Sequence, residues 1–446
     1  MASELSVIAR HAGTVLAGQL AVMAFGVTDT IVAGRFSEQS LAALSVGSAV
    51  YITVFVALMG LLQALLPVWA ELHGARQGAE LGRSVRQALY LAALASVAGV
   101  VGLLFPGGLL AWTEVPEALQ GTVREYLAVL ALALPPALAF RMYSTLNQSL
   151  GKPQLVTWLQ VIALAVKVPL TVWFAFGGLG VPALGAVGCA WATAAVNWLF
   201  LAMSLWLLRT QPLYRSYAIW RPLERPDWRV IRQFARLGVP AALAIMVEVT
   251  SFTLMALFIA RQGTQAAAAH QIAANLAAVM YMVPLSIAIA TSSRVSYWLG
   301  AGDAKLARGV IRTGFKMGFV LAVSMSLGML LARHGIASMY TSDPRVAVVA
   351  AGLLGWLAVF HLGDATQALC VFVLRCYRVA VAPLVAYCVL LWGMGLAGGF
   401  VLAYRGLAGW PAMQAPSAFW IAAASALGVL AFILPTILWR AVKGYR

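Results

Sequence analysis

The chain carries twelve apolar stretches, each long enough to cross a lipid bilayer as a helix. A transmembrane helix needs about 20 mostly apolar residues, whereas a strand of a membrane barrel needs about 9–11 residues that alternate in hydrophobicity. The stretches do not alternate, so the sequence predicts an all-α membrane protein with twelve transmembrane helices. We place them at residues 8–33, 44–72, 84–111, 121–148, 154–178, 183–209, 237–260, 270–299, 309–333, 346–374, 380–404 and 416–442.

The composition agrees with lipid as the main solvent of the chain. Of its 446 residues, 62% are hydrophobic and 10% are charged. A soluble domain has about 45–50% apolar and about 25% charged residues. The first apolar stretch is also too long for the core of a signal peptide, so we expect a retained helix.

The basic residues orient the twelve stretches. With the N-terminus in the cytoplasm, 22 of the 30 Lys and Arg residues fall in cytoplasmic loops or at the cytoplasmic ends of helices. Short cytoplasmic loops of membrane proteins carry such an excess of basic residues. The sequence therefore predicts that both termini are cytoplasmic. The net charge of +16 then reflects topology, and it does not indicate nucleic-acid binding.

The chain divides into two halves that resemble each other. A polar connector at 210–236 separates a predicted N-terminal six-helix bundle, 1–209, from a C-terminal one, 237–446. At an offset of 226 residues, Arg35 aligns with Arg261 and Gln39 with Gln265. Two repeats of six spans have the same orientation, so we expect a pseudo-twofold axis along the membrane normal. Two such bundles can rock about a cleft, which is the geometry of a transporter.

Three acidic residues lie inside apolar stretches. They are Asp29 in the first, Glu248 in the seventh and Asp364 in the tenth. An acid at the bilayer centre costs about 2.5–3.5 kcal/mol, so each should face a bundle interior or a watery cavity. Each could serve a structural hydrogen bond or ion pair between helices. Alternatively, such carboxylates could take up and release H⁺, or coordinate Na⁺ transiently, and so couple transport to an ion gradient.

Other polar residues inside the stretches are candidates for lining a substrate cavity. Lys167 in the fifth stretch either pairs with Asp29 or extends its ammonium toward the cytoplasmic surface. Gln271 and Asn275, one helical turn apart, line a cavity or join two helices by hydrogen bonds. The four cysteines lack the spacing of metal ligands or of a disulfide framework, so we expect them to pack as small apolar residues.

Several segments together resemble the multidrug and toxic compound extrusion (MATE) family, in its bacterial NorM-like branch. These segments are GVTDTIVAGRFSEQSLAALSVG in the first stretch and its exit loop, LLPVWAELHGA after the second, VPAALAIMVEVTSF in the seventh and FHLGDATQALCVFVLRCYR in the tenth. The similarity covers essentially the whole chain, including the two sets of six spans and the central connector.

The resemblance implies an efflux antiporter, not an enzyme, that exports cationic aromatic drugs and dyes in exchange for Na⁺ or H⁺. It implies that Asp29 acts in proton and drug exchange, and that Glu248 and Asp364 form a cation-linked site in the C-terminal half. Phe360, a cavity candidate one turn before Asp364, stands where some Na⁺-coupled relatives have a polar aromatic residue. We expect a monomer in the bacterial inner membrane that needs no cofactor beyond the coupling ion.

Two other functions compete with drug efflux. A flippase for lipid-linked precursors, from the same superfamily, would need a basic cavity for pyrophosphate, whereas the charges at cavity depth here are three acids and one lysine. An intramembrane aspartyl protease would need a GxGD signature. His361 occupies the position of the first glycine in that signature, and Thr28 stands where a tyrosine should precede Asp29.

Overall fold

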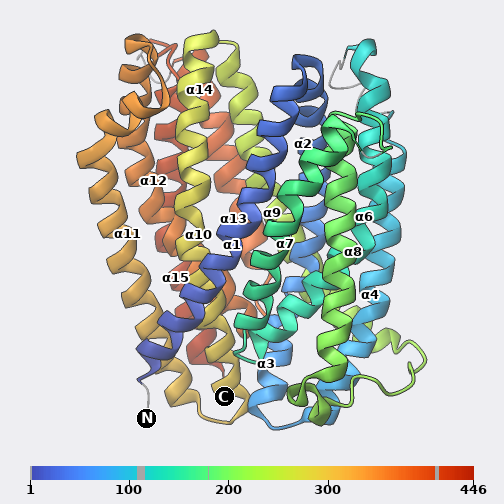
Figure 1. The fold of residues 1–446 in the computed structure, drawn as a ribbon. Helices are drawn as coiled ribbons and strands as arrows, with labels where there is room; N and C mark the ends of the chain where they lie inside the picture. Colours follow the sequence, from blue (N-terminus) through green and yellow to red (C-terminus); the bar gives the residue numbers. More distant parts are fainter. Residues whose placement is uncertain (1–2, 108–115, 179, 407–410, 446) are drawn as a thin grey trace. The chain divides into compact units, whose positions relative to one another are not determined.

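The computed structural model describes residues 3–107, 116–178, 180–406 and 411–445. These residues form helices and no β-strand, which confirms the predicted all-α fold (Figure 1). Within this part of the chain, twelve helical segments are long and apolar enough to cross a membrane. The helices are α1 (Glu4–Phe36), α2 (Glu38–Gln63), α3 (Leu66–Gly74), α4 (Gly78–Leu104), α6 (Glu117–Ser149), α7 (Gln154–Phe176), α8 (Ala186–Thr210), η1 (Pro212–Tyr217), α9 (Trp228–Ala260), α10 (Thr264–Gly300), α11 (Ala304–Tyr340), α12 (Pro344–Cys376), α13 (Val381–Tyr387), η2 (Cys388–Ala397), α14 (Gly398–Tyr404) and α15 (Ser417–Gly444).

The chain folds into two compact units. One comprises residues 14–242, and the other comprises residues 1–13 with 243–446. The division therefore falls inside α1 and inside α9 and not at the ends of the predicted connector. Residues 1–13 belong with the C-terminal half because Glu4 accepts hydrogen bonds from Arg294 Nε at 3.0 Å and from Trp298 Nε1 at 3.1 Å.

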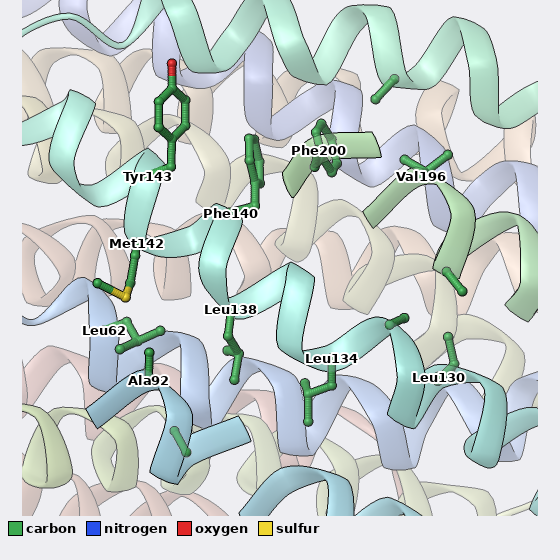
Figure 2. Close-up of a cluster of buried hydrophobic side chains, with 14 of the residues drawn as sticks. Leu62, Ala92, Leu130, Leu134, Leu138, Phe140, Met142, Tyr143, Val196 and Phe200 are labelled. Carbon is green, nitrogen blue, oxygen red and sulfur yellow. The ribbon is translucent and has the colours of Figure 1, made fainter. Parts of the chain in front are cut away.

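The 14–242 unit is built around α6, which packs against α2, α4 and α8. Leu130, Leu134 and Leu138 recur every four residues along α6, so they lie on one face of the helix and are buried together (Figure 2). The rings of Phe140 in α6 and Phe200 in α8 stack with their centroids 4.0 Å apart.

The connector is folded onto the 14–242 unit. Arg86 in α4 donates to the carbonyl of Ala218 at 2.7 Å and to Glu224 Oε1 at 2.6 Å. The hydroxyl of Tyr90, one turn along α4, donates to the Glu224 carbonyl at 2.7 Å. The segment expected to be one polar connector, 210–236, contains the short helix η1, and its last residues from Trp228 onward are the first turns of α9.

The other unit is built around α12, which packs against α10, α11 and α15. Gly363 lets α12 approach α15 closely, because a Cβ there would lie 2.7 Å from the Cβ of Leu427 in α15. The eleventh span is interrupted by η2, a π-helical segment over Cys388–Ala397 that sequence periodicity did not predict. Single π-helical turns inside α-helices occur frequently at functional sites.

Candidate ion and substrate sites

The first candidate site is a buried ion pair in the 14–242 unit. Lys167 Nζ in α7 lies 3.0 Å from both carboxylate oxygens of Asp29 in α1. It also donates to Thr193 Oγ1 in α8 at 2.6 Å. The Lys167 side chain is only 1% exposed, so the alternative in which its ammonium extends to the surface is wrong.

Neighbouring polar groups complete the surroundings of Asp29. The hydroxyl of Thr171, one turn after Lys167 on α7, donates to Asp29 Oδ1 at 3.4 Å. The Asp29 carbonyl is 3.8 Å from the Cys189 sulfur. Three helices, α1, α7 and α8, therefore meet at one carboxylate whose charge is balanced inside the protein. Sequence reasoning missed Thr193 because its role depends on how α8 is rotated.

The second candidate site joins the two acids of the C-terminal half. The side-chain amide nitrogen of Gln367 lies 2.8 Å from Asp364 Oδ1 and 3.3 Å from Glu248 Oε1. Gln367 is three residues after Asp364 on α12, so both face the same side of the helix, toward Glu248 on α9. The structure thus brings Glu248 and Asp364 together, and a neutral amide bridges them. Sequence reasoning did not single out Gln367, although its i+3 spacing from Asp364 could have indicated it.

A cavity adjoins this acid pair. Glu248 and Gln367 line it together with Phe252, Phe360 and Met255. The cavity is completed by Ser251, Leu391, Gly395, Leu396, Ala423 and Leu427, of which Leu391, Gly395 and Leu396 belong to the π-helical segment.

Aromatic rings pack around the same cavity. Phe360 makes edge contacts with Phe252, with centroids 5.7 Å apart, and with Trp420 of α15, with centroids 5.6 Å apart. Trp420 Nε1 donates to His270 Nδ1 at 3.3 Å, which holds the indole in place. Phe360 therefore lies where the sequence placed a cavity residue, whereas Trp420 and His270 were not singled out.

The remaining two candidates lie elsewhere. Gln271 Nε2 donates to Asn275 Oδ1 at 3.2 Å, and both side chains are exposed on α10. Neither lines the cavity beside Glu248. Their mutual hydrogen bond satisfies one polar group of each, and a substrate contact for them stays a prediction.

The described residues contain no cluster of three or more His, Cys, Asp or Glu side chains suited to a resident metal ion. None of the four cysteines, which all lie in the described part of the chain, forms a disulfide, and Cys189, Cys370 and Cys376 are buried. The carboxylates of Glu248 and Asp364 and the amide oxygen of Gln367 are hard oxygen donors, the type that hard cations prefer.

Twelve membrane-crossing helices with an ionisable site inside each unit define a membrane transporter rather than a soluble enzyme. The comparisons with known proteins identify its family. The MatE family profile matches residues 15–173 and 240–401, one segment in each half. The chain belongs to the MatE family, whose members are secondary transporters.

Named relatives and solved structures agree with this assignment. The chain is 36% identical to the probable multidrug resistance protein NorM of Aromatoleum aromaticum, over 89% of this chain and 85% of that protein. It is 35% identical to the NorM protein of Chromobacterium violaceum, over 99% of this chain and 95% of that one. The fold matches a crystal structure of MATE in the straight conformation with a TM-score of 0.88 at 16% identity, covering 99% and 97% of the two chains.

Proposed function

We propose that this protein is an antiporter that exports cationic aromatic drugs and dyes in exchange for Na⁺ or H⁺. The observation that carries the proposal is the acid pair Glu248 and Asp364, bridged by Gln367 beside a cavity within the spans. Two carboxylates without a counter-charge are costly inside a membrane. The pair should therefore take up a proton or a cation from one side and release it to the other.

The donor atoms at the acid pair fit either coupling ion. Gln367 uses its amide nitrogen to bridge the acids, and its carbonyl oxygen Oε1 is buried without a hydrogen-bond partner among the described residues. That oxygen can complete a Na⁺ site with the two carboxylates, since Na⁺ prefers oxygen ligands. A proton shared by the carboxylates would relieve the same repulsion.

The substrate class is supported by the aromatic walls and by the relatives. Phe252 and Phe360 line the cavity together with Glu248, and aromatic faces attract organic cations. NorM proteins similar to this chain are named for multidrug resistance. A flippase for pyrophosphate-linked lipids would need basic groups, whereas the described lining of the cavity beside Glu248 is one acid, the polar residues Ser251 and Gln367, and apolar residues.

We further propose a monomer in the bacterial inner membrane with both termini in the cytoplasm. The excess of Lys and Arg on the side of the termini supports this orientation. Transport would follow from rocking of two six-helix bundles, 1–209 and 237–446, about the cleft between them. Each bundle would contribute an acid to transport: Asp29 in the first would act in drug exchange, and Glu248 with Asp364 in the second would bind the coupling ion.

Dye efflux under separately imposed gradients tests the proposal. A cationic dye is added outside everted vesicles that contain the protein, where it meets the cytoplasmic face, and a gradient of H⁺ or of Na⁺, higher inside the vesicles, is applied alone. We expect one gradient or both to drive dye transport, and Glu248→Gln and Asp364→Asn to abolish the response. Asp29→Asn should impair transport as well. Glu38→Gln, which neutralises an exposed acid at the start of α2, is the matched control and should transport normally.

Two results would contradict the proposal. If neither gradient moved any cationic dye in vesicles that contain correctly inserted protein, antiport would be wrong. If Glu248→Gln and Asp364→Asn both kept full activity, the assignment of the coupling site would be wrong even if efflux itself occurred.

A further inference from the structure

The two candidate sites differ in what neutralises their acids. The Glu248–Asp364 pair is bridged by an uncharged amide, so its negative charge has no counter-charge in direct contact. Asp29 is in direct contact with a full positive charge, the ammonium of Lys167. One site therefore needs a cation from outside the protein, and the other already contains one.

The contacts of Lys167 are those of a bound monovalent cation. Three oxygens surround Nζ: both carboxylate oxygens of Asp29 at 3.0 Å and the hydroxyl of Thr193 at 2.6 Å. The Thr193 hydroxyl donates its own proton to the Cys189 carbonyl at 3.0 Å, which leaves its lone pairs free to face the ammonium. The ring of Phe25 lies 5.7 Å from Nζ and adds the attraction of an aromatic face.

The charge balance of this pocket limits what else can enter it. With Lys167 in place, Asp29 has no net charge left to attract a second cation. A free cation can bind the carboxylate only after the ammonium moves away, since both would need the same oxygens. The buried position of Lys167, with 1% of its side chain exposed, means that water does not screen this competition.

We propose that the Lys167 ammonium is a tethered cation that fills the cation site of the N-terminal half. Asp29 then binds no free Na⁺, and only a cation that displaces Lys167 engages it. An organic cation undergoing export does so by competing with Lys167 for the carboxylate, a role that rests on the proposed antiport. The occupation of the Asp29 site by the Lys167 ammonium does not depend on the antiport proposal. The Glu248–Asp364 pair is then the site at which the coupling ion binds.

Removing the tether should open the site to free cations, and thermal unfolding of the purified protein can detect this without transport. The experiment uses the Glu248→Gln/Asp364→Asn background, which eliminates the other acidic site. Unfolding temperatures are compared in NaCl, ethylammonium chloride and N-methylglucamine chloride at equal ionic strength. With Lys167 present, we expect the three salts to give the same unfolding temperature.

Lys167→Ala in this background should unfold at a lower temperature in N-methylglucamine, because Asp29 is then buried without a counter-charge. Na⁺ and ethylammonium should each raise the unfolding temperature, by about 1–2 °C for each tenfold excess over Kd. Adding Asp29→Asn should abolish the response to both cations. Lys167→Gln, which keeps a polar side chain of similar length, should show the same Asp29-dependent response if the alanine variant does not fold.

Two outcomes would overturn the proposal. One is an Asp29-dependent response to Na⁺ while Lys167 is present, which would mean that the tether does not fill the site. The other is the absence of any cation response in both Lys167→Ala and Lys167→Gln, which would mean that the pocket is not a cation site. Dye efflux is measured separately, on chains that keep Glu248 and Asp364. If efflux failed, the antiport proposal would be wrong, but the cation-dependent unfolding temperatures would still test whether Lys167 fills the site.

Discussion

At the scale of single residues, Gln367 determines how the two acids of the C-terminal half share one site. Its amide nitrogen contacts Asp364 at 2.8 Å and Glu248 at 3.3 Å. We expect Gln367→Leu, which keeps the side-chain volume, to lose two hydrogen bonds to acids, each worth about 1.5–3 kcal/mol. The unfolding temperature should fall, and gradient-driven dye transport should fall with it.

The matched control for Gln367→Leu is Thr366→Val. Thr366 is the preceding residue on α12, and its hydroxyl donates only to the carbonyl of Leu362 in its own helix, at 2.9 Å. That variant should unfold and transport like the original chain. Equal behaviour of the two variants would contradict a bridging role for Gln367.

A second residue-scale prediction concerns pH and the connector. The hydrogen bond from Arg86 holds the pKa of Glu224 below its ordinary value of 4.5. A lowered pKa in the folded state means that the contact stabilises the protein above pH 4.5, and that this contribution is lost as the pH falls through the lowered value. Glu224→Gln should therefore unfold at a lower temperature than the original chain at pH 7.

The difference between the two chains should shrink as the pH falls through the lowered pKa of Glu224, and should vanish once the carboxylate is protonated in both folded and unfolded chains. Thermal unfolding across this pH range measures it. Glu80→Gln neutralises an exposed acid on the same helix as Arg86 and controls for the general effect of removing a charge. A difference that persisted at the lowest pH would show that the ion pair is not its source.

At the scale of helices, the approach of α12 to α15 positions Asp364. A Cβ on Gly363 would lie 2.7 Å from the Leu427 Cβ and 2.9 Å from its carbonyl oxygen, so the two helices must separate in Gly363→Ala. Such overpacking costs about 1–3 kcal/mol. We expect a lower unfolding temperature and weaker dye transport, because the neighbouring Asp364 moves away from Glu248.

Gly352 on the same helix provides the comparison. A Cβ there meets nothing within 4 Å, and Ala is favoured over Gly inside a helix by about 0.5–1 kcal/mol. Gly352→Ala should therefore unfold at an equal or higher temperature. If Gly363→Ala were as stable as Gly352→Ala, close packing of α12 on α15 would not be the constraint on Asp364.

At the scale of the whole molecule, the sequence predicts the helices better than it predicts their partners. Apolar length alone is enough to predict twelve spans, because each must cross the same thickness of lipid. The pairing of Asp29 with Lys167 stayed open, since it depends on the rotation of α1 and α7 about their axes. The bridge by Gln367 and the π-helical segment at Cys388–Ala397 were missed, because both arise from packing between helices distant in sequence.

The orientation of the molecule in the membrane is a prediction of the charge pattern, and cysteine labelling tests it. The connector and both termini should be cytoplasmic, and the turn between α9 and α10 should face outward. Thr264, the first residue of α10 after that turn, and Arg221, in the connector, are both exposed. A membrane-impermeant maleimide should label Thr264→Cys in intact cells, and Arg221→Cys only after the cells are permeabilised.

The original chain is the control for this labelling, since Cys189, Cys370 and Cys376 are buried and Cys388 is partly buried. It should react weakly under both conditions. Labelling of Arg221→Cys in intact cells, with Thr264→Cys protected until permeabilisation, would reverse the orientation. In that case the 22 basic residues assigned to the cytoplasmic side would face outward, against the bias that orients short membrane loops.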